Sequence, residues 1–113
     1  MNTKKVIVLG TEYEIMLDAP EELMAENSDG ATDPFAKKIY IAKMEPDRDS
    51  TKNLEAYKKK VLRHEIVHAF FFESGLHSNS PSIDIWGINE ANVDWIAIQA
   101  PKLLEAFKEA GAL

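Results

Sequence analysis

The sequence predicts one α+β domain over residues 1–113: a small antiparallel or mixed sheet in the N-terminal part, packed on a long helix and followed by one or two C-terminal helices. Two observations support this prediction. Short apolar runs alternate with polar residues before about residue 45, and helical patterns fill the chain after about residue 52. A length of 113 residues suits a single domain with a small core.

Two strands are expected near the N-terminus. The stretch KVIVLGTEYEIML predicts a hairpin that turns at Gly10–Thr11. Tyr13, Ile15 and Leu17 alternate with more polar neighbours, so the second strand is expected to bury one face. The acidic residues that follow, up to Pro34, predict a loop with one helical turn near Glu21–Met24.

A further strand is expected in AKKIYIAKM, centred on Ile39-Tyr40-Ile41. The lysines at 37, 38 and 43 suit an edge position, because charge at a sheet edge discourages aggregation.

The longest element is expected to be a helix from about residue 52 to 74, capped by Ser50 or Thr51 and ended by Gly75. It is apolar on nearly every side from Val61 to Phe72, which predicts burial on several sides.

A last helix is expected from about Ile88 to Gln99, after a loop that contains Pro81. Pro101 is expected either to break this helix or to open a second one.

Composition excludes several classes of function. The net charge of −6 gives no general attraction to nucleic acid or to an anionic membrane. The absence of cysteine excludes disulfides and cysteine zinc ribbons, and it fits a reducing compartment. The N-terminal apolar run is too short for a signal peptide, and no segment is long enough to span a membrane. We therefore expect a cytoplasmic protein.

The most informative motif is His64-Glu65-Ile66-Val67-His68, which matches HExxH. Residues four apart on a helix point in nearly the same direction, so His64 and His68 can hold one metal ion between them. Glu65 points about 100° away from His64 and can reach a water on that ion. This spacing is typical of two histidines that bind Zn²⁺ and a glutamate that acts as general base. The alternative is a buried helix that carries two histidines without an ion, which would leave the imidazoles poorly solvated.

A catalytic zinc takes three protein ligands and one water. The pattern HExxHxxGxxH does not apply, because Phe71 and Ser74 stand at its glycine and third-histidine positions. His77 could loop back from beyond the helix, and Asp84 lies in a loop without a supporting pattern. The strongest candidate for the third ligand is Glu90 in GINEANVDW.

Glu90 and Asp94 stand one turn apart on the expected last helix and share a face, as His64 and His68 do. Two facing helices can thus supply two histidines and a carboxylate to one ion. Asp94 suits the role of acceptor for the second ring nitrogen of a metal-bound histidine. A solvated acidic helix face is the alternative interpretation.

The motifs HEIVH and NEANVD together resemble those of the gluzincin metallopeptidases, the thermolysin-like class of zincins. They lie within residues 61–101, about a third of the chain. The resemblance implies a zincin-like fold with His64, His68 and Glu90 as zinc ligands. It also implies that Glu65 is the general base and that Asp94 is the outer partner of His64.

The chain is far smaller than a full gluzincin. In size and in the stretch EANVDWIAIQAP it is similar to the short peptidase domains of bacteria, phages and mobile elements, such as the ImmA/IrrE type. Similarity to that type implies a metallopeptidase that acts on a peptide or protein. For some members of the type, the protein acted on is a transcriptional repressor. A SprT-like assignment fits HEIVHAFFF, but that family uses a third histidine, and only His77 is available here.

As a peptidase, the protein would use zinc to polarise the scissile carbonyl and its water, and Glu65 to carry a proton to the leaving amine. In zincins an edge strand beside the metal pairs with an extended peptide. We therefore expect Ile39, Tyr40, Ile41 and Ala42 to bind substrate as an added strand, unless their lysine neighbours only blunt a sheet edge.

Large gluzincins also supply a Tyr or His to the developing oxyanion. Tyr40 and His77 are the candidates for this role. Tyr57, about 10 Å from His64 by helical rise, is expected to be too far away.

Two other functions stay open. The first is a zinc-binding regulatory or interaction module without turnover, which the small size and the unassigned oxyanion donor support. Glu65 argues against it, since a structural site needs no base. The second is a metal-free helical interaction domain with Phe70–Phe72 and Trp86 or Trp95 as core.

Overall fold

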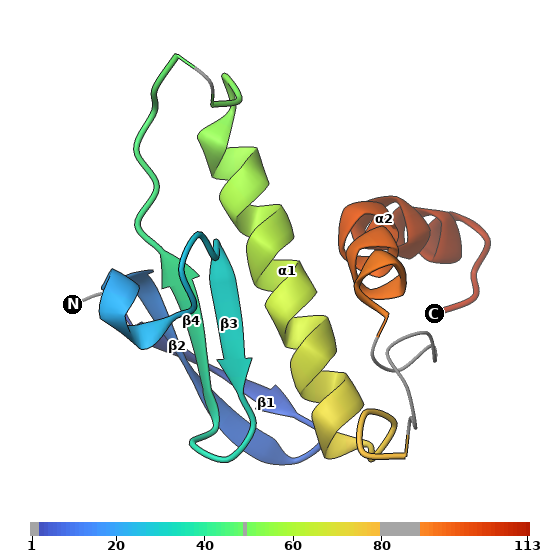
Figure 1. The fold of residues 1–113 in the computed structure, drawn as a ribbon. Helices are drawn as coiled ribbons and strands as arrows, with labels where there is room; N and C mark the ends of the chain where they lie inside the picture. The colour runs from blue at the N-terminus through green and yellow to red at the C-terminus, as the bar shows by residue number, and fades with distance from the viewer. Residues whose placement is uncertain (1–2, 49, 80–88) are drawn as a thin grey trace.

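A four-stranded sheet followed by two long helices makes up the fold in the computed structural model, which describes residues 3–48, 50–79 and 89–113 (Figure 1). The elements in chain order are β1 (Thr3–Val8), β2 (Thr11–Ala19), a 3-10 turn (Glu21–Leu23), β3 (Gly30–Asp33), β4 (Lys38–Ala42), α1 (Leu54–Glu73) and α2 (Glu90–Glu109). The predicted α+β class with a mixed sheet is confirmed. Neither α1 nor α2 is long and apolar enough to cross a membrane.

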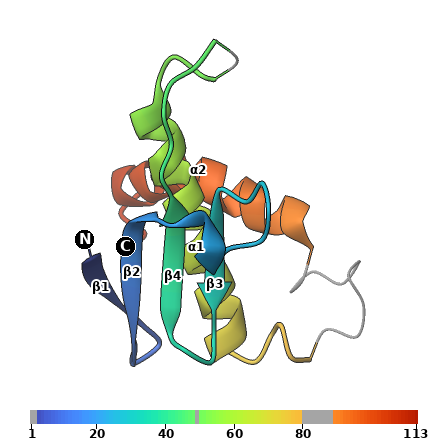
Figure 2. The same ribbon diagram turned by 60° about the vertical axis from the view of Figure 1, so that its left-hand side comes forward.

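The strand order is β1-β2-β4-β3 (Figure 2). β1 and β2 form the predicted antiparallel hairpin. Its two turn residues are Leu9 and Gly10, one position earlier than predicted, and both have positive φ. Such a two-residue turn matches the twist of the flanking strands. β4 runs parallel to β2 and antiparallel to β3, so the sheet is mixed.

The prediction that residues 39–42 form an edge strand is wrong. β4 lies inside the sheet, where Ile39 pairs with Ile15 of β2 on one side and with Thr32 of β3 on the other. The strand at this edge of the sheet is β3. The sequence predicts a loop here, because Gly-Ala-Thr-Asp has no apolar alternation. The β3–β4 turn is stabilised by Asp33, whose Oδ1 accepts hydrogen bonds from two backbone amides.

The core lies between the sheet and α1. One face of the sheet packs against Val61 and Ala69 of α1, through residues that include Tyr13, Ile15, Ile39 and Ile41. The predicted buried face of β2 is thus confirmed. α2 packs on α1 away from the sheet, so that α1 is the central element (Figure 1).

The helix boundaries differ slightly from the expected ones. α1 is capped by Asn53, whose side chain accepts a hydrogen bond from the amide of Ala56 at 3.1 Å. Ser50 instead closes a turn with Asp47. α1 ends before Gly75, as predicted, and this glycine has a φ of 83°.

α2 is one continuous helix from Glu90 to Glu109, so the prediction of a break near Pro101 is wrong. The aromatic core expected around α1 and α2 forms only in part. Phe71 is buried, whereas Phe70 and Trp95 are exposed. Trp86 lies outside the described residues.

Candidate metal centre

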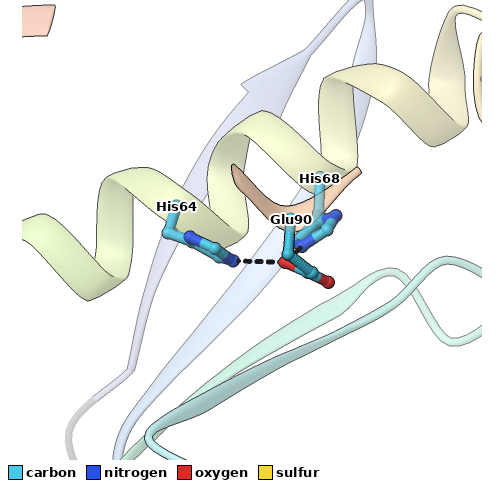
Figure 3. A group of neighbouring side chains, drawn as sticks. All are labelled: His64, His68 and Glu90. Carbon is cyan, nitrogen blue, oxygen red and sulfur yellow. Dashed lines mark hydrogen bonds and ion pairs between the residues drawn. The ribbon is translucent and has the colours of Figure 1, made fainter. Parts of the chain in front are cut away.

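Three side chains from two helices meet at one point (Figure 3). His64 and His68 come from α1, and Glu90 is the first residue of α2. Oε1 of Glu90 lies 2.9 Å from Nε2 of each histidine. One ligand atom from each of the three residues lies within 4.8 Å of the others. The structure therefore brings together the three residues that the sequence predicts as ligands.

The donor set fits a zinc ion. Nitrogen and oxygen donors that share a tetrahedral zinc at about 2.1 Å stand roughly 3.4 Å apart. The observed separations, from 2.9 Å to no more than 4.8 Å, span that value. Three protein donors leave a fourth position for water or substrate. The side chain of Glu90 is 66% exposed, so the three-residue group is open to solvent on the Glu90 side.

Local structure sets the direction of each donor. His64 and His68 are four residues apart on α1, and their ring centroids lie 4.9 Å apart. The side chain of Asn89 caps α2 by accepting hydrogen bonds from the amides of Ala91 and Asn92. This cap starts the helix at Glu90 and thereby directs its side chain towards α1.

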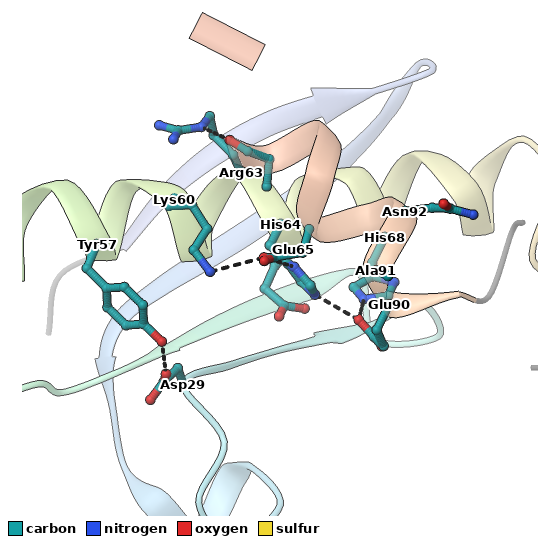
Figure 4. A network of polar contacts seen from close by, with 12 residues as sticks. Asp29, Tyr57, Lys60, Arg63, His64, Glu65, His68, Glu90, Ala91 and Asn92 are labelled. Atoms are coloured by element: carbon teal, nitrogen blue, oxygen red, sulfur yellow. Dashed lines mark hydrogen bonds and ion pairs between the residues drawn. The ribbon is translucent and has the colours of Figure 1, made fainter. Parts of the chain in front are cut away.

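Asp94 contacts the ring nitrogen of His64 that faces away from Glu90, as the sequence predicts. Its Oδ1 is 3.1 Å from Nδ1 of His64 and 3.0 Å from Nζ of Lys60. Figure 4 shows His64 and Lys60 in this network. Burial raises the pKa of Asp94, but the hydrogen bonds from Lys60 and His64 outweigh this effect, and the pKa lies below its ordinary value. An ionised Asp94 can hold the His64 ring with Nε2 directed at Glu90.

Glu65 lies on the sheet side of the same turn of α1. It is 7% exposed, and its Oε1 accepts a hydrogen bond of 2.8 Å from the hydroxyl of Thr32 in β3. Burial raises the pKa of Glu65, while Thr32 and the two histidines lower it to a smaller extent. A Cβ at Gly30 would stand only 3.0 Å from Cγ of Glu65, so the absence of a side chain at this position lets β3 approach α1.

A cleft of about 480 Å³ connects Glu65 with the three donors. β3 lines the cleft through Gly30, Ala31 and Thr32, and α1 lines it through residues that include His64 and Glu65. Within the described residues, no strand pairs with the outer edge of β3. The cleft therefore combines a potential metal site, a buried carboxylate and an open strand edge.

The residues predicted to bind substrate lie elsewhere. Both edges of β4 are occupied by β2 and β3, so Ile39, Tyr40, Ile41 and Ala42 cannot accept a peptide as an additional strand. Ile39 and Ile41 also belong to the core. β3 occupies the sheet edge instead. The sequence does not predict this strand, because Gly-Ala-Thr-Asp has no apolar alternation and resembles a loop.

The remaining candidates have different positions. The ring of His77 lies 4.2 Å from that of Phe72 and lines the cleft, but His77 is not part of the three-residue group found among the described residues. Tyr40 points to the opposite face of the sheet from its buried neighbours. Tyr57, expected to be too distant, also lines the cleft and donates its hydroxyl proton to Asp29. Asp84 lies outside the described residues.

Comparison with models of protein families, with curated protein sequences and with solved structures finds no match to this chain. The functional argument consequently depends on the geometry of the cleft and on the chemistry of its side chains.

Proposed function

We propose that this protein is a small zinc-dependent peptidase of the zincin type. The observation that carries the proposal is the convergence of His64, His68 and Glu90 beside the buried carboxylate of Glu65. A purely structural zinc site has no need for a carboxylate held next to the ligands without being one of them. The α+β architecture, with HExxH on the central helix and the third ligand on the next helix, is consistent with this proposal.

Zinc, when bound, would act as a Lewis acid towards the scissile carbonyl and the attacking water. Glu65 would take the proton that the water loses as its oxygen bonds to the carbonyl carbon. Glu65 would then give that proton to the amide nitrogen as the C–N bond breaks. Burial raises the pKa of Glu65, which makes its carboxylate a stronger proton acceptor than an exposed one.

The substrate would be a peptide or an unfolded protein segment in extended conformation. The outer edge of β3 faces no described strand and borders the same cleft as the donors. Main-chain hydrogen bonds between this edge and the substrate would place a carbonyl group near Glu65 and the ligands. Recognition of this kind depends mainly on backbone shape, and it would tolerate many side chains.

The test compares the wild type with Glu65→Gln and Glu90→Ala, all loaded with zinc, on a mixture of unfolded proteins. We expect the wild type to create new peptide termini, detected by mass spectrometry. Glu65→Gln should keep about one zinc per chain and lose cleavage, whereas Glu90→Ala should lose zinc affinity.

Two results would contradict the proposal. Equal cleavage by the wild type and Glu65→Gln would remove Glu65 as the base. Zinc binding by the wild type without any cleavage would favour the alternative function, a zinc-binding regulatory module without turnover.

A further inference from the structure

Pro101 removes one main-chain hydrogen bond from α2, and a side chain of α1 replaces the missing donor. In an α-helix the amide of residue 101 would donate to the carbonyl of residue 97, but proline has no N–H. Ala97 is fully buried, so water cannot readily replace that donor. A buried carbonyl without a partner would be unfavourable.

Arg63 supplies the missing donor. Its Nε lies 2.6 Å from the carbonyl oxygen of Ala97, so the bond connects α1 to α2. Arg63 is labelled in Figure 4. The contact lies close to the candidate metal centre, because Arg63 precedes His64 and Ala97 lies one turn after Asp94. Two further contacts from α1 reach Asp94, one from Lys60 and one from His64.

The contact fixes the position of α2 along α1. A hydrogen bond to a main-chain carbonyl has a fixed place on the helix, unlike apolar packing, which tolerates sliding. A shift of α2 would move Glu90 and Asp94 together, since both belong to its first turns. The 2.9 Å distances from Glu90 to both histidines require one particular position.

We infer that Arg63 acts as a positioning residue that replaces the absent amide of Pro101 and thereby places Glu90 against His64 and His68. This inference rests on the proposed function only in taking these three residues as zinc ligands. In this role Arg63 acts on the three candidate ligands only through the position of α2. Arg63 and Pro101 are therefore a coupled pair. The proline leaves the carbonyl of Ala97 without its helical donor, and the arginine donates to that carbonyl instead.

A double-mutant cycle tests the inference with Arg63→Met, Pro101→Ala and the double variant. Methionine retains an apolar stem without a donor, and alanine restores an amide at position 101. Zinc affinity is measured by competition with a chromophoric chelator, and unfolding of the zinc-free chain by urea. Lys59→Met, which removes an exposed positive charge from α1, is the matched control.

We expect Arg63→Met to weaken zinc binding about tenfold, the lower end of the range for residues that orient metal ligands. Pro101→Ala and Lys59→Met should bind zinc like the wild type. The double variant should recover most of the lost affinity, because its carbonyl at 97 again has a helical donor. The urea midpoint should follow the same order.

Wild-type zinc affinity in Arg63→Met would overturn the inference. An equal loss in Arg63→Met and the double variant would also overturn it, since Arg63 would then act independently of Pro101. Failure of the wild type to bind zinc would refute the metal site and with it the positioning role. The urea cycle would still report separately whether Arg63 and Pro101 are coupled.

Discussion

The hydroxyl of Thr32 connects the edge strand to the residue on which peptidase chemistry would depend. Its oxygen lies 2.8 Å from Oε1 of Glu65 and 2.9 Å from the main-chain oxygen of the same residue. A hydroxyl has a single proton to donate, so these two acceptors share it. Gly30, two residues earlier, allows the close approach that this contact needs.

Replacing Thr32 by valine should affect the ionisation of Glu65 more than the shape of the cleft. The hydrogen bond from Thr32 lowers the pKa of Glu65 against the raising effect of burial. Its loss should raise that pKa, so the acidic limb of the kcat/KM profile should move to higher pH. Folding stability should fall by about 1–3 kcal/mol, because a buried acceptor loses its donor.

Thr32→Ser is the control for this prediction, since serine keeps the hydroxyl. Its pH profile should remain close to that of the wild type, while zinc affinity should be unchanged in both variants. A valine variant with the wild-type pH profile would show that Thr32 does not influence the ionisation of Glu65.

Among single residues, the sequence predicts those that recur at helical spacing along one helix. It does not predict the residues of other elements that contact them in the folded chain. HExxH and the Glu90–Asp94 pair have a helical period that can be recognised without a structure. Thr32 and Arg63 have no such pattern. Thr32 reaches Glu65 only because β3 forms, and Arg63 reaches Ala97 only because α2 packs on α1.

Among the elements, α1 is held to the sheet at its C-terminal end by a cluster around Glu73. Oε2 of Glu73 accepts hydrogen bonds from the hydroxyl of Tyr13 at 2.7 Å and from Nζ of Lys37 at 2.8 Å. Tyr13 belongs to β2, and Lys37 closes the β3–β4 turn. The cluster therefore fixes the end of the helix that follows the histidines against two parts of the sheet.

This cluster predicts how stability depends on pH. The ion pair with Lys37, together with the bond from Tyr13, lowers the pKa of Glu73 from 4.5 to about 2. A group whose pKa is lowered by folding stabilises the protein while it is ionised. The contribution of Glu73 should be complete above about pH 4.5 and disappear as the pH falls to about 2.

The variant Glu73→Gln should be less stable than the wild type at neutral pH, and this difference should shrink through the acidic interval. Urea unfolding across that interval measures the effect. Glu105→Gln, which changes an exposed carboxylate on α2, is the control. A difference between wild type and Glu73→Gln that stays constant with pH would contradict the assignment.

The elements that the sequence predicts correctly are those with internal signals. The first hairpin has apolar alternation around a glycine turn, and α1 has a long apolar stretch ended by Gly75. β3 has no such signal and forms by pairing with β4, whereas α2 continues through Pro101, a residue that predicts a helix boundary. In β3 a tertiary contact outweighs local preference, and in α2 the hydrogen bond from Arg63 to the carbonyl of Ala97 replaces the donor that Pro101 lacks.

At the scale of the whole molecule, the two helices differ in how firmly they are held. α1 packs against both the sheet and α2, whereas α2 contacts mainly α1. The C-terminal part of α2 leaves Leu104 and Phe107 exposed. A small domain of this kind has a small free energy of unfolding. An ion that connects α1 to α2 should therefore raise that free energy measurably.

Zinc should stabilise the folded chain by mass action, because its donors converge only when α2 is docked. At a free zinc concentration about 100 times the Kd, the expected gain is about 2.7 kcal/mol. A chelator should reverse this gain in thermal unfolding of the wild type. Glu90→Ala should show little dependence on zinc, while Glu105→Ala, elsewhere on α2, should respond like the wild type.

The stabilisation by zinc should also differ between the elements of the molecule. Hydrogen exchange of the backbone amides measures this difference. Without zinc, α2 can separate from α1 while the sheet and α1 remain packed, so its amides should exchange through local opening. Zinc must be released before that opening occurs, and it should therefore slow exchange in α2 far more than in β2 or β4. Equal protection of all elements would mean that α2 opens only when the whole chain unfolds. Unchanged exchange in α2 would mean that the ion does not connect the two helices.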